Sequence, residues 1–304
     1  MKFEKKGLIC NSASLGLHWA GRNIMTPLPI VLPNHDIRVF LTVCDDDNVG
    51  RVGFVDLNPD SPNEIKRISE CPCLDVGASG MFDEHGVLPT SLLLIDDAMY
   101  LYYSAYQRQV SVPYTILSGL AVSKDYGETF SRVSECPILE RCDGQLFQRS
   151  AIEVMERDGR YLMWYTAGSG WQNNSGHVVP RYNIQYMESA DYKSWTGKPV
   201  VSLELHGDEY GLTMPQVEYK NGKYRMVYSI RSVSKGYRMG YAESEDGIAF
   251  RRMDDQIQLE PSPSGWDSEM ICFGKMLSVH DRTYMFYCGN HYGLGGMGWA
   301  ELVE

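Results

Sequence analysis

Short segments dominated by apolar and aromatic residues recur along the chain at nearly even intervals. Five of them begin at Ile37, Tyr100, Tyr161, Tyr224 and Tyr284, so successive starts lie 63, 61, 63 and 60 residues apart. β-Branched and aromatic residues fit the pleated surface of a sheet, so each segment predicts a strand. The last four segments follow short polar turns: Asp96-Asp97, Asp158-Gly159, Asn221-Gly222 and His280-Asp281. Such turns tolerate the positive φ of a tight hairpin, so each of these strands is predicted to follow a hairpin turn.

A further apolar strand follows each of these segments, and three of the further strands run into similar turns. The turns span residues 123–130, 189–195 and 244–250, and each contains Ser, then Asp, then a closing aromatic residue. An Asp side chain that accepts hydrogen bonds from its own downstream amides, followed by an aromatic plug, makes a self-contained loop. We therefore assign these turns a structural role.

The repeat predicts the fold class. Copies of a β unit of roughly sixty residues, without a long amphipathic helix, exclude a Rossmann domain and a TIM barrel. Radial repetition of small sheets is the arrangement of a β-propeller. We therefore expect an all-β protein: one five-bladed β-propeller domain over residues 1–304, with four-stranded antiparallel blades at roughly 15–70, 75–137, 140–200, 205–260 and 265–304. Residues 2–11 are expected to supply the outer strand that the last blade otherwise lacks.

The charge balance narrows the class of partner. The chain carries 39 Asp and Glu against 28 Lys and Arg, a formal net charge of −11, so nucleic acids and anionic membranes would repel it. No apolar run approaches the roughly 18–20 residues of a membrane helix, and the first residues are too polar for a signal peptide. The eight cysteines form no Cys-x-x-Cys pair, so we expect reduced thiols, no metal site and a cytoplasmic protein.

The repeated strands and turns resemble those of the five-bladed propeller glycosidases, which include glycoside hydrolase family 43, the invertases and levansucrases, and the mannoside phosphorylases. The turn at residues 123–130 is similar to the Asp-box of sialidases and other propellers. The chain more closely resembles propeller proteins encoded among bacterial surface-polysaccharide and modified-sugar biosynthesis genes. That resemblance rests on His18-Trp19-x-x-Arg22-Asn23, Leu74-Asp75-Val76-Gly77-x-x-Gly80-x-Phe82-Asp83, Gly168-Ser169-Gly170-Trp171, Pro180-Arg181-Tyr182, Gly207-Asp208-Glu209-Tyr210 and Gly265-Trp266-Asp267-Ser268. It implies a carbohydrate-active protein whose ligand lies at one end of the central channel.

Acidic residues in the loops that precede the inner strands are the candidate catalytic groups. Glycoside cleavage generally needs two carboxyl groups, one to protonate the leaving oxygen and one to activate water or attack directly. We predict Asp83 with Glu209, and then Asp267 with Glu269, as the facing pairs. The alternative is that these acids pair with arginines and hold loops in place. The resemblance implies an Asp in the first blade and a Glu in the third, where this chain instead has Arg22-Asn23 and Arg149-Ser150.

Basic and aromatic residues in the same loops are the candidate ligand-binding groups. Arginine suits bidentate recognition of carboxylate or phosphate, so the basic residues predict an anionic ligand. The alternative is that they pair with nearby acids. Aromatic residues there can stack on a sugar or fill the contacts between blades. The predicted binding residues are His18, Trp19, Arg22, Asn23, His85, Arg149, Trp171, Arg181, Tyr182 and Tyr210, with His177 and Trp266 as further candidates.

Two functional hypotheses follow. The first is an enzyme that acts on a glycosidic or glycosyl-phosphate bond of an anionic sugar: a sugar phosphate, a nucleotide sugar or an acidic sugar. The second is a catalytically silent propeller that binds an acidic glycan or a partner protein, and a transferase with a nucleotide-sugar donor lies between them. The polar loops favour the enzyme, and the missing family acids favour the binding protein. We expect no cofactor; the resemblance allows a calcium ion in the channel, but no residue pattern indicates one.

Overall fold

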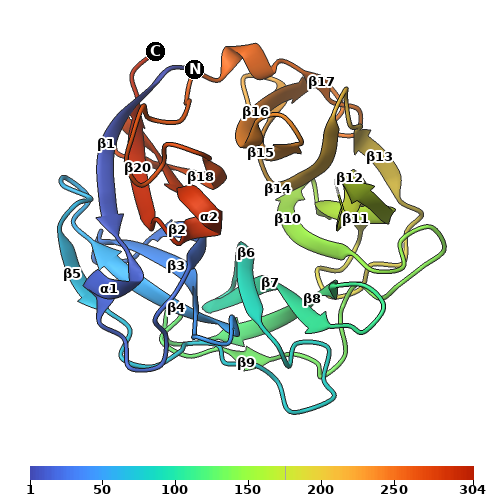
Figure 1. Cartoon of the computed structure of the whole chain (residues 1–304), viewed down its shortest axis with the longest axis horizontal. Helices are drawn as coiled ribbons and strands as arrows, with labels where there is room; N and C mark the ends of the chain where they lie inside the picture. Colours follow the sequence, from blue (N-terminus) through green and yellow to red (C-terminus); the bar gives the residue numbers. More distant parts are fainter. Residues whose placement is uncertain (175) are drawn as a thin grey trace.

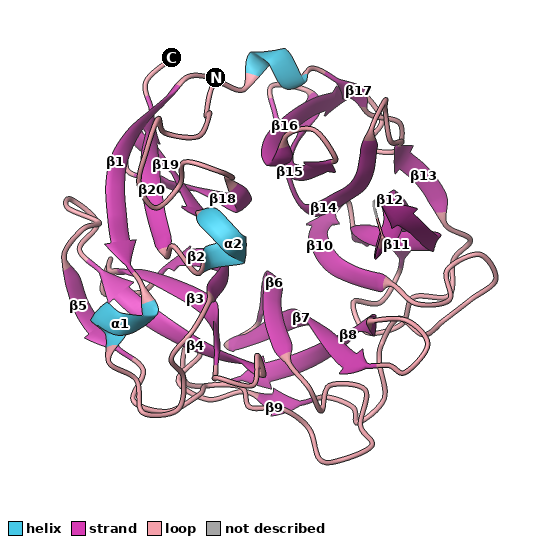
Figure 2. Ribbon diagram, viewed as in Figure 1, coloured by secondary structure: helices cyan, strands magenta, loops and turns pink. Residues whose placement is uncertain are grey.

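The protein consists almost entirely of antiparallel β-sheets. The computed structural model describes residues 1–174 and 176–304. The first sheet contains β2 (Ile24–Val31), β3 (Ile37–Cys44), β4 (Gly50–Leu57) and β5 (Ile65–Ile68), in that order. The second contains β6 (Val87–Ile95), β7 (Ala98–Arg108), β8 (Tyr114–Ser123) and β9 (Ser131–Arg132). Two four-residue helices, α1 (Ser12–Leu15) and α2 (Asn290–Gly293), and the 3₁₀ turn Asp254–Gln256 complete the described elements (Figure 2).

The next sheet has eight strands and consists of two antiparallel halves. Its first half contains β10 (Arg149–Arg157), β11 (Arg160–Asn174), β12 (His177–Ser189) and β13 (Val200–Leu203). Its second half contains β14 (Glu209–Lys220), β15 (Lys223–Ser232), β16 (Gly236–Ser244) and β17 (Arg251–Arg252). A single parallel bridge between Tyr182 and Gly211 joins the halves.

The last sheet combines the two ends of the chain. It contains β18 (Cys272–Val279), β19 (Arg282–Cys288), β20 (Met297–Leu302) and β1 (Phe3–Cys10). β1 pairs antiparallel with β20, as the outermost strand of that sheet. The two termini therefore lie side by side (Figure 1).

The sheets stand around a common centre. Five strands are innermost: β2, β6, β10, β14 and β18. Each packs on the next, and β18 packs on β2, so the five strands form a ring (Figure 1). This ring of contacts brings residues from all the sheets to one central space.

The predicted hairpins and Asp turns are present. Asp96, Asp158, Asn221 and His280 have φ between 51° and 54° and connect the first and second strands of their units. In the Asp turns, the carboxylates accept hydrogen bonds from downstream amides, as Asp125 does from Thr129 at 3.0 Å. The closing aromatic residues Phe130, Trp195 and Phe250 are buried. These turns are therefore structural, as the sequence predicts.

The innermost strands share an irregularity near the centre. The register shifts within the pairs of β2, β6, β10, β14 and β18 with their neighbours. At four of these bulges a residue other than glycine has a positive φ: Thr26 (52°), Ala151 (50°), Met214 (52°) and Phe273 (59°). Serine hydroxyl groups on β7 and β15 hold two of these residues in place. Ser104 Oγ accepts a hydrogen bond from the Ala151 amide at 2.8 Å, and Ser229 Oγ accepts one from the Phe273 amide at 2.9 Å.

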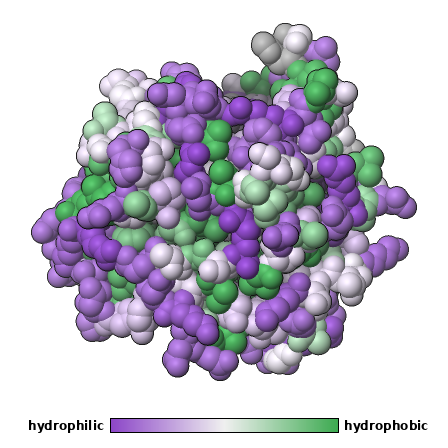
Figure 3. Space-filling model, turned by 90° about the horizontal axis from the view of Figure 1, so that it is seen from below, coloured by the Kyte–Doolittle hydropathy of each residue, from purple (hydrophilic) through white to green (hydrophobic). Residues whose placement is uncertain are grey.

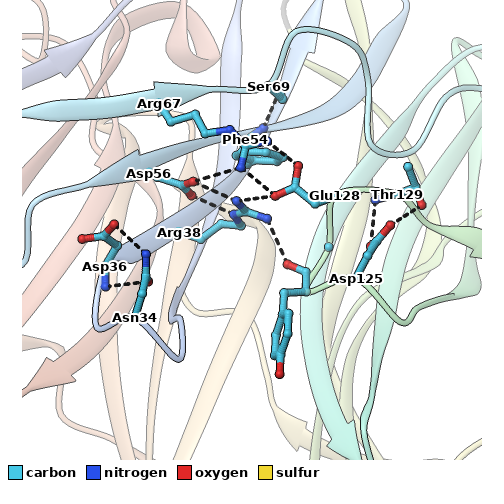
Figure 4. A network of polar contacts seen from close by, with 12 residues as sticks. Asn34, Asp36, Arg38, Phe54, Asp56, Arg67, Ser69, Asp125, Glu128 and Thr129 are labelled. Carbon is cyan, nitrogen blue, oxygen red and sulfur yellow. Dashed lines mark hydrogen bonds and ion pairs between the residues drawn. The ribbon is translucent and has the colours of Figure 1, made fainter.

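A polar network connects the first sheet to the turn between β8 and β9 of the second sheet (Figure 4). Arg38 on β3 is 2 % exposed and forms two bonds to Asp56, at 2.7 and 2.8 Å. It also pairs at 2.8 Å with Glu128 in the turn between β8 and β9, and its guanidinium lies 3.6 Å from the centre of the Phe54 ring. Glu128 in turn binds the exposed Arg67. A buried cation thus links the two sheets.

The surface is mixed in character. Hydrophilic and hydrophobic residues are interspersed on the side of the molecule seen in Figure 3. No helix in residues 1–174 or 176–304 has the length and apolar composition needed to cross a membrane. All eight cysteines are free thiols, and five of them are buried.

Candidate functional site

A central pocket of about 450 Å³ lies where the innermost strands converge. All the sheets contribute to its wall, and the four bulge residues with positive φ lie in it. Tyrosines, hydroxyl groups and amides supply most of its polar groups. The lining residues are Asn23, Met25, Thr26, Cys44, Asn48, Leu88, Ser104, Tyr106, Tyr114, Ile116, Gln148, Ser150, Ala151, Tyr182, Thr213, Met214, Arg231, Tyr237, Phe273 and Tyr292.

Arg231, at the end of β15, is the one charged side chain among the described lining residues. Its guanidinium carbon lies 4.8 Å from the centre of the Tyr210 ring and 5.4 Å from those of Tyr237 and Tyr292. It donates a hydrogen bond to Tyr292 Oη. In the part of the chain that the structure describes, Arg231 takes part in no ion pair, since its electrostatic neighbours are tyrosines. A partly buried cation is therefore surrounded by neutral groups.

The phenol groups around Arg231 do not supply the missing negative charge. Burial raises the pKa of Tyr114, Tyr210 and Tyr237 above the usual tyrosine value, so all three are protonated at neutral pH. Tyr237 also shares a hydrogen bond of 3.0 Å with the hydroxyl of Tyr182. The positive charge of Arg231 is therefore stabilised only by π faces and neutral oxygens. This leaves the pocket complementary to an anion.

Gln148 offers a second group without a partner. The residue is 5 % exposed and precedes β10. Its Nε2 donates to Ser150 Oγ at 3.3 Å, whereas its Oε1 is buried and has no hydrogen-bond partner among the described residues. Buried polar atoms without a partner are rare, because each costs about 1–3 kcal/mol. Gln148 Oε1 is thus an acceptor suited to a ligand hydroxyl or amide.

The predicted catalytic carboxylates do not line this pocket. Asp83 is fully buried; its Oδ2 accepts from Arg132 at 2.7 Å and from the hydroxyl of Tyr103 at 3.1 Å. Asp267 follows the same scheme, with Lys5 at 2.6 Å and Tyr287 at 3.0 Å. In both, the tyrosine belongs to the repeated aromatic strand and the cation to the outermost strand of the same sheet.

The other two candidate acids also have local partners. Both oxygens of Glu209 bind Arg252 on β17, at 2.6 and 2.7 Å. Glu269 is exposed and lies 3.3 Å from the His291 imidazole. The pairs Asp83–Glu209 and Asp267–Glu269 are not brought together in the pocket. The contacts of Asp83, Asp267 and Glu209 instead match the alternative hypothesis, in which acids pair with bases and hold loops in place.

Of the predicted binding residues, Asn23 and Tyr182 lie in the pocket wall. Asn23 donates to the carbonyl groups of His291 and Tyr292, at 2.7 and 3.2 Å, and so helps to position Tyr292. Tyr210 packs beside Arg231. Trp171 reaches the pocket indirectly, because its ring lies 5.4 Å from the lining residue Tyr114.

The remaining predicted binding residues lie outside the pocket wall. Arg149 is buried against Tyr165 and donates to the Glu140 carbonyl, Arg22 donates to the Asp46 carbonyl, and the Trp19 indole donates to the Glu70 carbonyl. His18 and Arg181 are exposed, and Trp266 stacks on Tyr287. His85 lies 3.6 Å from Glu84. The side chain of His177 is outside the described part of the chain.

Sequence reasoning missed Arg231 and Gln148. A partial signal for Arg231 exists: three of the five repeated segments end in Thr42, Ser104 and Ser229, and the residues two positions further on, Cys44, Tyr106 and Arg231, line the pocket. Gln148 belongs to a loop before an inner strand, and the predicted binding residue of that loop is its neighbour Arg149. Among the described residues, no group of three or more His, Cys, Asp or Glu side chains is placed to hold a metal ion.

Two known proteins are similar in sequence to nearly the whole chain. No protein-family profile matches it. The uncharacterized protein Rv1502 of Mycobacterium tuberculosis is 30 % identical over 303 residues, which cover 99 % of both chains. The chain belongs to the Rv1502 family. The corresponding protein MT1551 from another strain of that organism gives the same identity and coverage.

Solved structures that resemble the Rv1502-family chain include glycoside hydrolases. One glycoside hydrolase has a TM-score of 0.74 and 17 % identity, over 98 % of this chain and 90 % of its own. A thermostable family-43 glycoside hydrolase has a TM-score of 0.67 and 18 % identity, over 93 % and 89 %. A structure from the GH130 family of mannoside phosphorylases has a TM-score of 0.69 and 15 % identity, over 99 % and 90 %. This likeness shows the fold alone, which is the propeller fold that the sequence predicts.

Proposed function

We propose that this protein is a carbohydrate-active propeller that binds an anionic sugar in its central pocket, with Arg231 as the anchor for the anion. The observation that carries this proposal is a partly buried guanidinium without a carboxylate partner among the described residues. A buried charge that the protein itself does not neutralise costs several kcal/mol, and an anionic ligand recovers that cost on binding. The glycoside hydrolase fold of its structural neighbours supports a sugar as the carrier of the anion.

The same proposal includes the number of blades, the class of ligand and the cellular role. Counting the eight-stranded sheet as two blades gives five blades in all, with Tyr182 and Gly211 bridging the third and fourth. The sugar phosphate, nucleotide sugar or acidic sugar expected from the sequence is the ligand class. A cytoplasmic role in bacterial surface-polysaccharide or modified-sugar metabolism follows the sequence resemblance alone.

A thermal-shift screen with neutral glycosides, sugar phosphates, nucleotide sugars and acidic sugars tests the proposal. An anionic ligand at 100 times its Kd stabilises the folded state by about 2.7 kcal/mol. Arg231→Gln is expected to weaken binding by about 2–5 kcal/mol, roughly thirtyfold or more, because the anion loses its charged partner. The unliganded variant is expected to unfold no earlier than the natural protein.

Arg22→Gln is the matched control, since Arg22 lies near the pocket but outside its wall. It is expected to leave ligand binding nearly unchanged. If Arg22→Gln lost binding and Arg231→Gln kept it, the anion would bind at Arg22, outside the pocket wall, and not at Arg231. A shift with neutral glycosides alone would remove the proposal.

Enzymatic cleavage of a glycosidic or glycosyl-phosphate bond is the second candidate. Its support is the backbone of the pocket, where Thr26, Ala151, Met214 and Phe273 hold a positive φ. Such strained residues cluster at active sites. The sequence assigns the chemistry to Asp83 and Glu209, which lie outside the described pocket wall, so the sugar would have to extend beyond that wall to reach them. If the assignment holds, Asp83→Asn and Glu209→Gln abolish turnover of a bound sugar and leave its affinity unchanged. Unchanged turnover in both variants would remove that assignment, and product analysis by chromatography distinguishes the two results.

A further inference from the structure

The pocket interior holds one positive charge. Arg231 is the single charged residue of the described wall. Two other arginines lie nearby, but Arg22 and Arg108 donate to the backbone carbonyls of Asp46 and Asp47 and are not part of the wall. A ligand with one negative charge neutralises Arg231. A phosphate monoester carries about −1.5 to −2 charges at pH 7 and would leave a charge uncompensated in the same space.

The surroundings of Arg231 suit a planar anion. Three tyrosine rings lie within 5.4 Å of the guanidinium carbon, and Tyr292 Oη accepts one of its N–H groups. Guanidinium has five N–H donors in a planar fork, and a carboxylate matches two of them at once. A single carboxylate therefore fits both the charge and the shape of this site.

Gln148 requires a different group on the same ligand. Because Nε2 donates to Ser150, the atom without a partner is the acceptor Oε1, which needs a donor. A carboxylate supplies no donor at neutral pH, whereas a sugar hydroxyl does. The volume of about 450 Å³ is in the lower part of the roughly 300–1,000 Å³ range of small-molecule pockets. A nucleoside-diphosphate sugar would bring a larger body and two phosphate charges.

We propose that the pocket selects a monoanionic acidic sugar, with its carboxylate on Arg231 and one of its hydroxyl groups on Gln148. This inference rests on the proposed function and narrows its three ligand classes to one. Gln148 is then a specificity-determining residue, because it separates a sugar acid from a simple carboxylate.

Calorimetric titration of the natural protein at pH 7 tests the charge selection without any variant. The probes are matched sets that differ at carbon 6: glucose, glucuronate and glucose 6-phosphate, with the corresponding galacto and manno compounds. In at least one set, the uronate is expected to bind tenfold or more tightly than both the phosphate and the neutral sugar. Acetate is expected to bind at least tenfold more weakly than that uronate, since it offers no hydroxyl to Gln148.

Gln148→Met is expected to weaken uronate binding about tenfold, the effect of one hydrogen bond. Gln107→Met is the control, because Gln107 bonds to Glu84 outside the pocket wall. Gln148→Asn, which keeps the amide but withdraws it, replaces Gln148→Met if the latter does not fold. Equal uronate affinity in the folded Gln148 variant and the Gln107 control would overturn the role of Gln148.

The outcomes separate the two proposals. A sugar phosphate that binds as tightly as its uronate, with binding lost in Arg231→Gln, overturns the monoanion inference and leaves the proposed function standing. Neutral sugars that bind as tightly as both anions overturn both, and so does the absence of binding by every probe.

Discussion

Lys275→Met is expected to destabilise the protein by about 3–5 kcal/mol at pH 7, as judged by chemical unfolding. Lys275 on β18 is 1 % exposed and donates to Glu153 on β10 and to the Pro215 carbonyl on β14, each at 2.8 Å. Three of the innermost strands therefore meet at one ammonium group. Glu153 lies two residues after the bulge residue Ala151, and Lys275 lies two residues after the bulge residue Phe273. Removing the ammonium group leaves the Glu153 carboxylate buried without its counter-ion.

The pH dependence identifies the cause. Burial raises the pKa of Glu153 above the usual glutamate value, and Lys275 opposes that rise. An acid with a raised folded-state pKa destabilises the fold while it is ionised, and this penalty shrinks as the pH falls from the raised pKa to the usual glutamate value. The Lys275→Met deficit should thus be largest at neutral pH and shrink in acid.

The double variant Glu153→Gln with Lys275→Met is the control, because it removes both charges. It is expected to recover most of the lost stability. A deficit that stays the same in acid and in the double variant would instead assign the effect to packing and to the Pro215 carbonyl.

Arg38→Met is expected to cost about 3–5 kcal/mol, because it leaves Asp56 and Glu128 without their buried cation. Arg38 joins the first sheet to the second, and methionine preserves much of the contact with Phe54 while removing the charge (Figure 4). Partial burial favours the neutral acid, but bonds from Arg67 and Arg38 hold the pKa of Glu128 below its usual value. Ionised Glu128 therefore stabilises the fold above the ordinary glutamate pKa, and this stabilisation is lost as the pH falls through the lowered pKa of Glu128.

Arg67→Met is the matched control for Arg38. Arg67 binds the same Glu128, but its side chain is 53 % exposed, so solvent screens the pair and the expected loss is about 0–1 kcal/mol. Thermal or chemical unfolding of both variants measures the difference. Equal losses would mean that burial of Arg38 does not set the strength of the contact between the sheets.

Local sequence patterns determined the repeating part of this protein. The spacing of the aromatic strands, the positive φ of turn residues such as Asp96 and Asn221, and the Ser-Asp-aromatic turns each depend on neighbours a few residues away. For the same reason, the all-β class and the propeller fold could be predicted without any knowledge of long-range contacts.

The tertiary structure decided which polar residues share the central space. Asp83, Glu209 and Asp267 lie in or at the ends of the expected loops, but their partners Arg132, Arg252 and Lys5 are 49, 43 and 262 residues away and come from outermost strands. No spacing in the sequence reveals such pairs. Arg231 and Gln148 become neighbours of one pocket because the sheets converge there, and the direction in which each side chain faces depends on the register and bulges of the innermost strands. The sequence predicts arginines near the central space, and the packing of the sheets determines that Arg231 is the one in the described pocket wall.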